Sequence, residues 1–108
     1  MILENPAGQA VFRHDKMGKA DLARGEKLFC GLNTFEPGQR HEAHVHADQD
    51  KLYVVLEGVA DVSVGGDKRR VAPGGVALAV AGERHGIENA GSERLIVLVV
   101  MSPPPPAR

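Results

Sequence analysis

The most informative part of the chain reads Gly38-Gln-Arg-His-Glu-Ala-His44-Val-His46-Ala-Asp-Gln-Asp50-Lys51-Leu-Tyr-Val-Val-Leu-Glu-Gly58. Two histidines, His44 and His46, are separated by one residue just before a run rich in β-branched and aromatic residues. Because alternate residues of a β-strand point to the same face, the two imidazoles can converge on one point. Neutral imidazole, the form that binds divalent transition metals, predominates near pH 7. The pair therefore indicates part of a metal site, and other segments have to supply the remaining ligands.

The size and charge of the chain limit the classes of function. A length of 108 residues suits one domain with its own core. The 13 Lys and Arg against 14 Asp and Glu do not favour binding to nucleic acid or to an anionic membrane. The single cysteine excludes an intramolecular disulfide and fits a reducing compartment. With no signal-peptide pattern and no apolar run as long as a membrane span, we expect a soluble, cytoplasmic protein.

Short apolar runs separated by Gly and Pro turns follow one another along the chain. They predict about eight short strands and no long helix, which is typical of an all-β sandwich or barrel. The run at residues 95–101 is apolar on both alternating faces, as in a strand buried on both sides. The four prolines that follow it cannot donate ladder hydrogen bonds and should end the sheet. We therefore predict an irregular or edge-strand segment (residues 1–26), a single β-barrel domain (27–101) and a proline-rich tail (102–108).

The residues just before the histidine pair predict a turn, and they predict that the side chain of His41 points to the face opposite the pair. Glu36-Pro37-Gly38-Gln39 has proline and glycine at the two central positions, the pattern of a type II turn. His41 stands three residues before His44, so in a continuous strand its side chain would point to the opposite face. We therefore do not expect His41 to be a metal ligand.

Residues 38–89 resemble the cupin superfamily, small jelly-roll barrels (double-stranded β-helices) with a metal site inside. The first cupin signature places a His-X-His pair and then a glutamate between two glycines. The second places a glycine, a Pro-X-Gly, a histidine and an asparagine in that order. The chain matches the two signatures, in order and at the right separations, at Gly38, His44, His46, Gly58, Gly74, Gly82, His85 and Asn89. It departs from them at Val80, which replaces the proline, and at Lys51, which replaces the glutamate.

The resemblance implies that His85 joins His44 and His46 as the third metal ligand. A barrel brings strands that are distant in sequence together, and Ile87 and Asn89, which share the alternation of His85, would line the same interior. Three neutral imidazoles around a divalent transition metal leave positions open for water or substrate. Iron, zinc, nickel, manganese and copper all suit such a site, and the ligand types alone do not distinguish them.

Lys51 stands where the cupin pattern has its glutamate, and a protonated lysine cannot ligate a metal. It can turn away and leave a three-histidine site, or stay beside the metal to bind an anionic substrate or move a proton. Alternatively, a slip of the strand makes Asp50 the fourth ligand. Counting back from Gly58, strand alternation places Lys51, Tyr53 and Val55 on the interior face. This count favours three histidines first and Asp50 as fourth ligand second.

The resemblance implies a small single-domain cupin that binds a metal and a small polar or anionic organic molecule inside the barrel. Among enzymatic roles, dioxygenase chemistry comes first by resemblance, with isomerase, lyase or decarboxylase chemistry next. A non-enzymatic sensor or storage protein and a metal-free structural barrel are the alternatives. Small cupins commonly pair through exposed strands, so we expect a homodimer, with neither nucleic acid nor membrane as partner.

Overall fold

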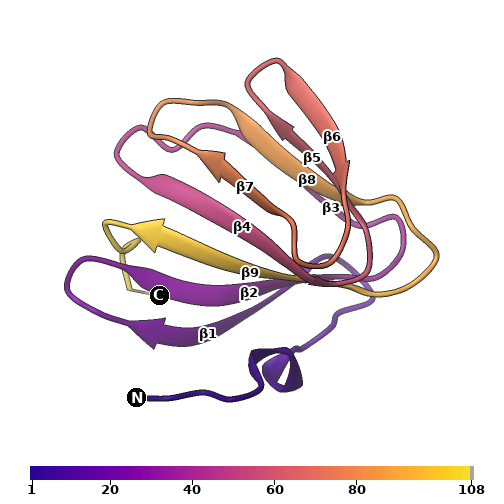
Figure 1. Cartoon of the computed structure of the whole chain (residues 1–108), viewed down its shortest axis with the longest axis horizontal. Helices are drawn as coiled ribbons and strands as arrows, with labels where there is room; N and C mark the ends of the chain where they lie inside the picture. Colours follow the sequence, from indigo (N-terminus) through magenta and orange to yellow (C-terminus); the bar gives the residue numbers. More distant parts are fainter. Residues whose placement is uncertain (108) are drawn as a thin grey trace.

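The computed structural model describes residues 1–107, and its regular elements, apart from one 3-10 turn, are β-strands. They form two antiparallel sheets that pack face to face (Figure 1). The predicted all-β architecture is confirmed. Within residues 1–107, no helix has the length and apolar character needed to cross a membrane. A 3-10 turn at Pro6–Gln9 precedes the strands, which are β1 (Gly18–Arg24), β2 (Phe29–Phe35), β3 (Arg40–His44), β4 (Asp50–Glu57), β5 (Ala60–Val64), β6 (Asp67–Val71), β7 (Val76–Ala79), β8 (His85–Asn89) and β9 (Leu95–Ser102).

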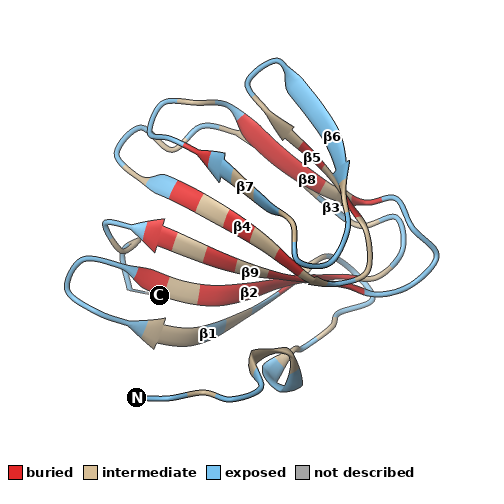
Figure 2. Cartoon of the chain, viewed as in Figure 1, coloured by how far each residue is buried: buried red, intermediate tan, exposed pale blue. Residues whose placement is uncertain are grey.

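The larger sheet has the order β1-β2-β9-β4-β7, and the smaller sheet has the order β3-β8-β5-β6. Strand β9 lies between β2 and β4, where Val97 pairs with Asn33 on one side and Val55 on the other. Leu95, Ile96 and Val97 are all buried, as the apolar run on both faces predicts. Figure 2 shows buried positions concentrated in β2, β4, β8 and β9, while β6 and β7 are mostly exposed. The core therefore fills the space between the centres of the two sheets.

Strand β4 alternates between the interior and the outer face in the predicted register. Lys51, Tyr53 and Val55 are buried, and the residues between them are half-buried on the other side. Tyr53 and Val55 belong to the main hydrophobic cluster, which also takes in Ile87 from the opposite sheet. The lysine therefore shares a face with the barrel core.

The turn before β3 has the predicted geometry. The Gln39 N–H donates to the Glu36 carbonyl at 3.1 Å, and Gly38 has a φ of 86°, which glycine adopts without strain. The turn is also tied to the end of β8, since the Gly38 N–H donates to the Asn89 carbonyl and the Asn89 N–H to the Gln39 carbonyl. These bonds fix β3 and β8, the strands that carry the histidines, against each other.

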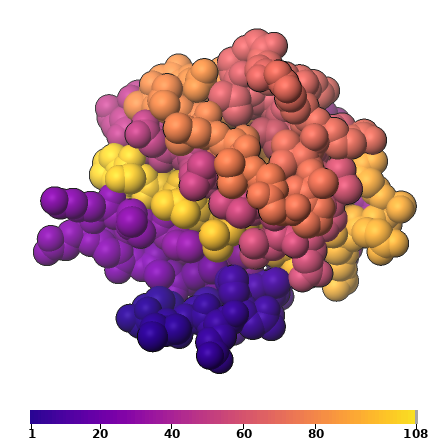
Figure 3. All heavy atoms as spheres, viewed as in Figure 1, coloured from indigo at the N-terminus to yellow at the C-terminus, as the bar shows by residue number. Residues whose placement is uncertain are grey.

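Strand β1 forms one edge of the larger sheet, and the N-terminal segment lies along this edge. Strand β1 is an edge strand paired with β2, in a region where the sequence predicts either irregular structure or an edge strand. The first residues, indigo in Figure 3, lie along this side of the molecule. They are joined to it by a hydrogen bond from the Thr34 hydroxyl to the Val11 carbonyl. Strand β1, which is the one strand beyond the eight that the sequence predicts, is therefore an edge strand of the larger sheet.

Strand β9 ends at Ser102, directly before the prolines, and the residues that follow turn back against the barrel. Arg24 Nη2 donates to the Pro105 carbonyl at 2.7 Å, and Gln49 Nε2 donates to the Pro103 carbonyl at 3.0 Å. The sequence gives no signal for these contacts, because both donors are exposed-type polar residues far from the tail in sequence. The tail is thus part of the barrel surface.

Candidate metal centre

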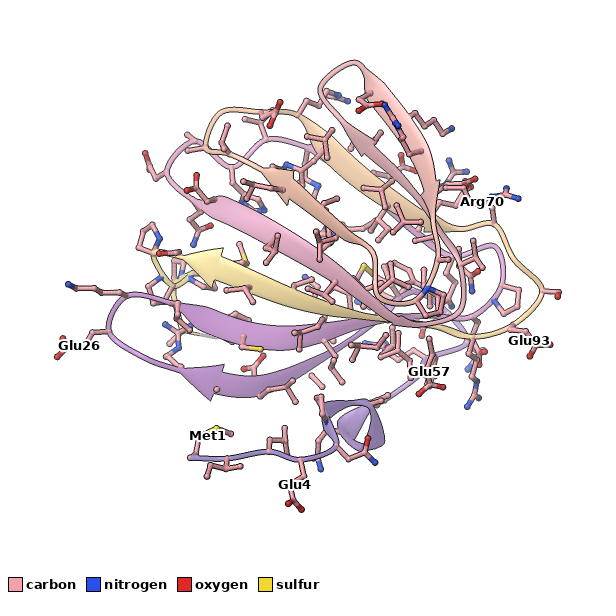
Figure 4. The ribbon with its side chains drawn as sticks, in the orientation of Figure 1. Met1, Glu4, Glu26, Glu57, Arg70 and Glu93 are labelled. Atoms are coloured by element: carbon pink, nitrogen blue, oxygen red, sulfur yellow. The ribbon has the colours of Figure 1, made fainter. Side chains whose placement is uncertain are left out.

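The three predicted histidine ligands lie together at one end of the barrel. His44 ends β3, His85 begins β8, and the two residues are paired across the strands. His46 follows two residues after β3 ends. One ring nitrogen from each of the three residues lies within 4.8 Å of the others. In Figure 4 this is the end marked by Glu26, on the turn between β1 and β2, and Glu57 marks the opposite end.

Backbone carbonyls orient two of the imidazole rings. His44 Nδ1 lies 2.7 Å from the Glu42 carbonyl, and His85 Nδ1 lies 2.9 Å from the Glu83 carbonyl. Because a carbonyl oxygen only accepts hydrogen bonds, each Nδ1 carries the proton and donates it. The Nε2 atoms of both rings are therefore left with free lone pairs, as in histidines that ligate a metal.

The positions of the Nε2 atoms fit a shared cation. Those of His44 and His46 are 3.0 Å apart. Two nitrogens that each lie about 2.1 Å from one metal ion are separated by roughly 3.0 to 3.4 Å. His85 is 1% exposed, and its buried Nε2 has no hydrogen-bond partner among the described residues. A cation beside this nitrogen would satisfy it, so the donor set suits a divalent transition metal.

The electrostatic environment keeps the imidazoles in the form that binds metal. Burial, followed by the charge of His44, lowers the pKa of His46 to about 4. Burial also lowers the pKa of His85, although its bond to the Glu83 carbonyl opposes the shift. Both rings are therefore neutral near pH 7 and can bind a cation without first losing a proton.

His41 points into the site, and the prediction that it points away is wrong. The strand register shifts by one residue between the pairs His41–Ile87 and His44–His85. Such a bulge adds a residue to one strand and reverses the alternation of faces beyond it. The His41 ring consequently lies 4.3 Å from the His44 ring, centroid to centroid, although it is not part of the three-histidine cluster. Burial and the charge of Lys51 lower its pKa to about 3.

Lys51 lies on the interior face and is 3% exposed. Burial, followed by the charge of Lys19, lowers its pKa to about 8. Its ammonium sits 5.1 Å from the centre of the Tyr53 ring, a favourable cation–π contact. Within the described chain it has neither a carboxylate partner nor a hydrogen-bond acceptor. Of the sequence alternatives, this geometry matches a lysine that stays beside the histidines.

Asp50 lies on the opposite face of β4. It is exposed, and its Oδ1 accepts a hydrogen bond from the Ala81 N–H at 2.8 Å. A shift of β4 by one residue would be needed to turn this carboxylate inward, and the same shift would expel Tyr53 from the core. The structure gives no support to Asp50 as a fourth ligand.

A cavity of about 490 Å³, called the chamber below, adjoins His44 and His46. Lys51 and His41 line it, and so do several residues that sequence reasoning missed. These come mainly from β1, β2, β9 and the tail. The sequence does not define the edge strand β1, and within β2 and β9 it does not show which side chains face a cavity. The missed lining residues used below are Lys19, Asn33, Arg24, Phe29, Met101 and Pro105.

Comparison with known proteins identifies the family. The sequence profile of the cupin domain matches residues 31–101. An uncharacterized protein of Streptomyces coelicolor, SCO3923, is 38% identical over 81 residues, which cover 75% of each chain. The tetracenomycin polyketide synthase protein TcmJ of Streptomyces glaucescens is 32% identical over 75 residues, which cover 69% of this chain and 50% of TcmJ.

The solved structures show the same fold. TT1209 from Thermus thermophilus superimposes with a TM-score of 0.92 and 35% identity, covering 97% of this chain and 100% of TT1209. The two facing sheets thus form the jelly-roll barrel that the resemblance implies. Together with the profile match over residues 31–101, these relatives show that the chain belongs to the cupin family.

Proposed function

We propose that this cupin holds a divalent transition metal on His44, His46 and His85 and binds a small polar or anionic organic molecule in the chamber. The observation that carries the proposal is the buried, unpartnered Nε2 of His85 beside the paired Nε2 atoms of the other two histidines. Nothing else in the described barrel satisfies that nitrogen. A cation would do so while leaving positions open toward the chamber.

The protein's own residues prepare the site in distinct ways. Carbonyl oxygens of Glu42 and Glu83 hold two rings with Nε2 exposed to the cation. When bound, the metal supplies Lewis-acid polarisation or redox chemistry at its open positions. Lys51 contributes an ammonium that attracts an anionic group, and it can give or accept a proton near its lowered pKa of about 8. The apolar barrel core behind them excludes water.

Within this proposal, dioxygenase chemistry is the first candidate for the reaction. This choice rests on the three-histidine ligand set, on Lys51 at the position of the cupin glutamate, and on the family resemblance. Isomerase, lyase or decarboxylase chemistry uses the same site without oxygen, and a sensor or storage role uses it without turnover. The name of the Streptomyces glaucescens relative associates that protein with polyketide synthesis, which supports a small organic ligand for this chain too.

We also propose that the protein pairs with a second copy of itself. The edge strand β7 leaves Val76 and Leu78 exposed by 63% and 54%. Half-buried Leu52 and Val54 of the neighbouring strand share this outer face. An exposed apolar edge of this kind is normally covered by a partner. A cytoplasmic location stays a prediction from the sequence.

Elemental analysis of purified, untagged protein tests the metal site. We expect about one equivalent of a transition metal in wild type and in His14→Ala, which removes an exposed histidine outside the three-histidine cluster, and loss of the metal in His44→Ala. Iron would direct the next assay to oxygen uptake, and zinc or nickel to lyase or isomerase substrates. Absence of metal from wild type, with binding restored in Lys51→Glu, would show a metal-free barrel and overturn the proposal.

A further inference from the structure

An unpartnered buried amide and a buried lysine line the chamber. Asn33 is 4% exposed, and its Nδ2 makes no hydrogen bond within the described residues. Lys51 is 3% exposed and has no carboxylate beside it. An unpaired buried donor destabilises the protein, and a buried charge does so more strongly. Both side chains line the chamber, so a ligand with acceptor atoms can satisfy them there.

The charged residues around the chamber favour an anion. Among the described lining residues, Lys19, Arg24 and Lys51 are cationic and Asp21 is the single carboxylate. Arg24 already donates to the tail carbonyl of Pro105, while Lys51 lies deepest. A ligand carboxylate beside Lys51 would form a charge-assisted hydrogen bond and relieve the repulsion between the two lysines.

An apolar wall runs across the sheet from Lys51. In the strand register Lys51 pairs with Met101 of β9, and Met101 pairs with Phe29 of β2. All three side chains are on the interior face, and the apolar pair is buried to more than nine-tenths. Neighbouring strands are about 4.8 Å apart, so the wall extends roughly 10 Å from the lysine. Both apolar residues line the chamber beside Lys51, so an organic ligand held there can contact them, which a bare inorganic anion cannot do to the same extent.

We propose that the ligand of the chamber is an organic carboxylate with an apolar body, whose acid group binds Lys51 and whose body packs against Met101 and Phe29. A single ring or a short branched chain fills the length of the wall. We take the cavity beside the histidines as the ligand chamber, so this ligand class rests on the function proposed above. It adds the position of the acid group and the need for an apolar body.

Calorimetric titration of metal-stripped protein near pH 7 tests this ligand class with three probes. Benzoate has both features, benzamide is its uncharged counterpart, and acetate lacks the apolar body. We expect benzoate to bind roughly tenfold or more tightly than either of the others, the factor expected from one charge-assisted hydrogen bond or one buried ring. Equal binding of benzoate and benzamide, or of benzoate and acetate, would overturn the proposal.

Variants then locate the acid group. Lys51→Met and Lys51→Gln should each weaken benzoate by about tenfold and leave benzamide unchanged. Lys68→Met removes the same charge from the exposed strand β6 and should change neither. Two neutral replacements are used so that a folding defect in one, visible by circular dichroism, does not decide the result. Unchanged benzoate affinity in a folded Lys51 variant would contradict the assignment.

A metal-site variant separates this proposal from the function above. Benzoate that binds metal-stripped wild type and His44→Ala equally, and depends on Lys51, supports the carboxylate site whether or not a metal is held. If wild type also holds no metal, the metal proposal alone fails. Benzoate that binds only zinc-loaded wild type, independently of Lys51, would support the metal site and overturn the role of the lysine.

Discussion

At the scale of single residues, the buried charge of Lys51 lowers the stability of the folded protein. Its charge is removed from water without a carboxylate partner, which destabilises the folded state. The Lys51 pKa falls from 10.5 to about 8, which corresponds to about 3 kcal/mol. A residue that weakens the fold and lines a cavity is typical of a functional position.

Replacing Lys51 by methionine should therefore stabilise the metal-free protein. We expect the free energy of unfolding near pH 7 to rise by about 1 to 3 kcal/mol, since methionine keeps the volume and loses the charge. Urea denaturation of wild type and variant measures the difference. Lys68→Met, on exposed strand β6, is the control and should change stability by less than about 0.5 kcal/mol. A destabilised Lys51→Met would show that the ammonium is already satisfied.

The same residue should make stability depend on pH in the alkaline range. Because the folded pKa is about 8 and the unfolded value is 10.5, the unfolded chain binds more protons between these limits. The destabilisation is complete below pH 8 and is relieved as the pH rises toward 10.5. Burial raises the pKa of Tyr53, which acts in the opposite direction above pH 10. The gap between wild type and Lys51→Met should therefore narrow from pH 8 upward, and parallel curves would refute this.

At the scale of elements, the connections between strands depend on glycines for two different reasons. Gly38 and Gly58 both have φ above 80°. A Cβ on Gly38 would meet no atom within 4 Å, whereas one on Gly58 would collide with the Arg94 carbonyl oxygen. Gly58 also begins the link from β4 in one sheet to β5 in the other. Its lack of a side chain is therefore needed for packing as well as for conformation.

Replacing each of these two glycines by alanine should distinguish the stability lost to backbone strain from the stability lost to steric collision. Gly38→Ala should cost about 1 to 2 kcal/mol, from the left-handed backbone alone. Gly58→Ala should cost clearly more, because the backbone around Arg94 has to move as well. Chemical denaturation of the two variants measures both losses against wild type. Equal losses of stability in the two variants would mean that the backbone near Arg94 moves aside without a free-energy penalty.

The elements also show where sequence reasoning works and where it fails. Alternation along a strand predicted that His44 and His46 converge, the cupin resemblance added His85, and the three histidines do lie together. Counting from Gly58 placed Lys51 inside for the same reason. His41 escaped this logic because a bulge, which leaves no mark in the sequence, reversed the alternation before His44. Lys19 was missed because the sequence does not define the edge strand that carries it, and Asn33 because a polar residue within a strand gives no signal that it faces a cavity.

At the scale of the whole molecule, the apolar edge at β7 predicts the state of association. Light scattering should give twice the mass of one chain for wild type. Leu78→Lys places a charge on the proposed interface and should shift the protein to monomer. Leu28→Lys makes the same change at a turn residue of similar exposure, 47% against 54%, and should leave the dimer intact. A monomeric wild type would contradict the pairing.

The position of β9 has a consequence for how the chain folds. This strand follows all the others in sequence, yet it lies in the middle of the larger sheet. During synthesis from the N-terminus, β2 and β4 therefore leave the ribosome with no neighbour between them. The backbone N–H and C=O groups along their facing edges stay unpaired until β9 inserts. The sheet is therefore complete only after translation has passed residue 102. The larger sheet should therefore form only once β9 is available, and a nascent chain stalled before β9 should be sensitive to protease.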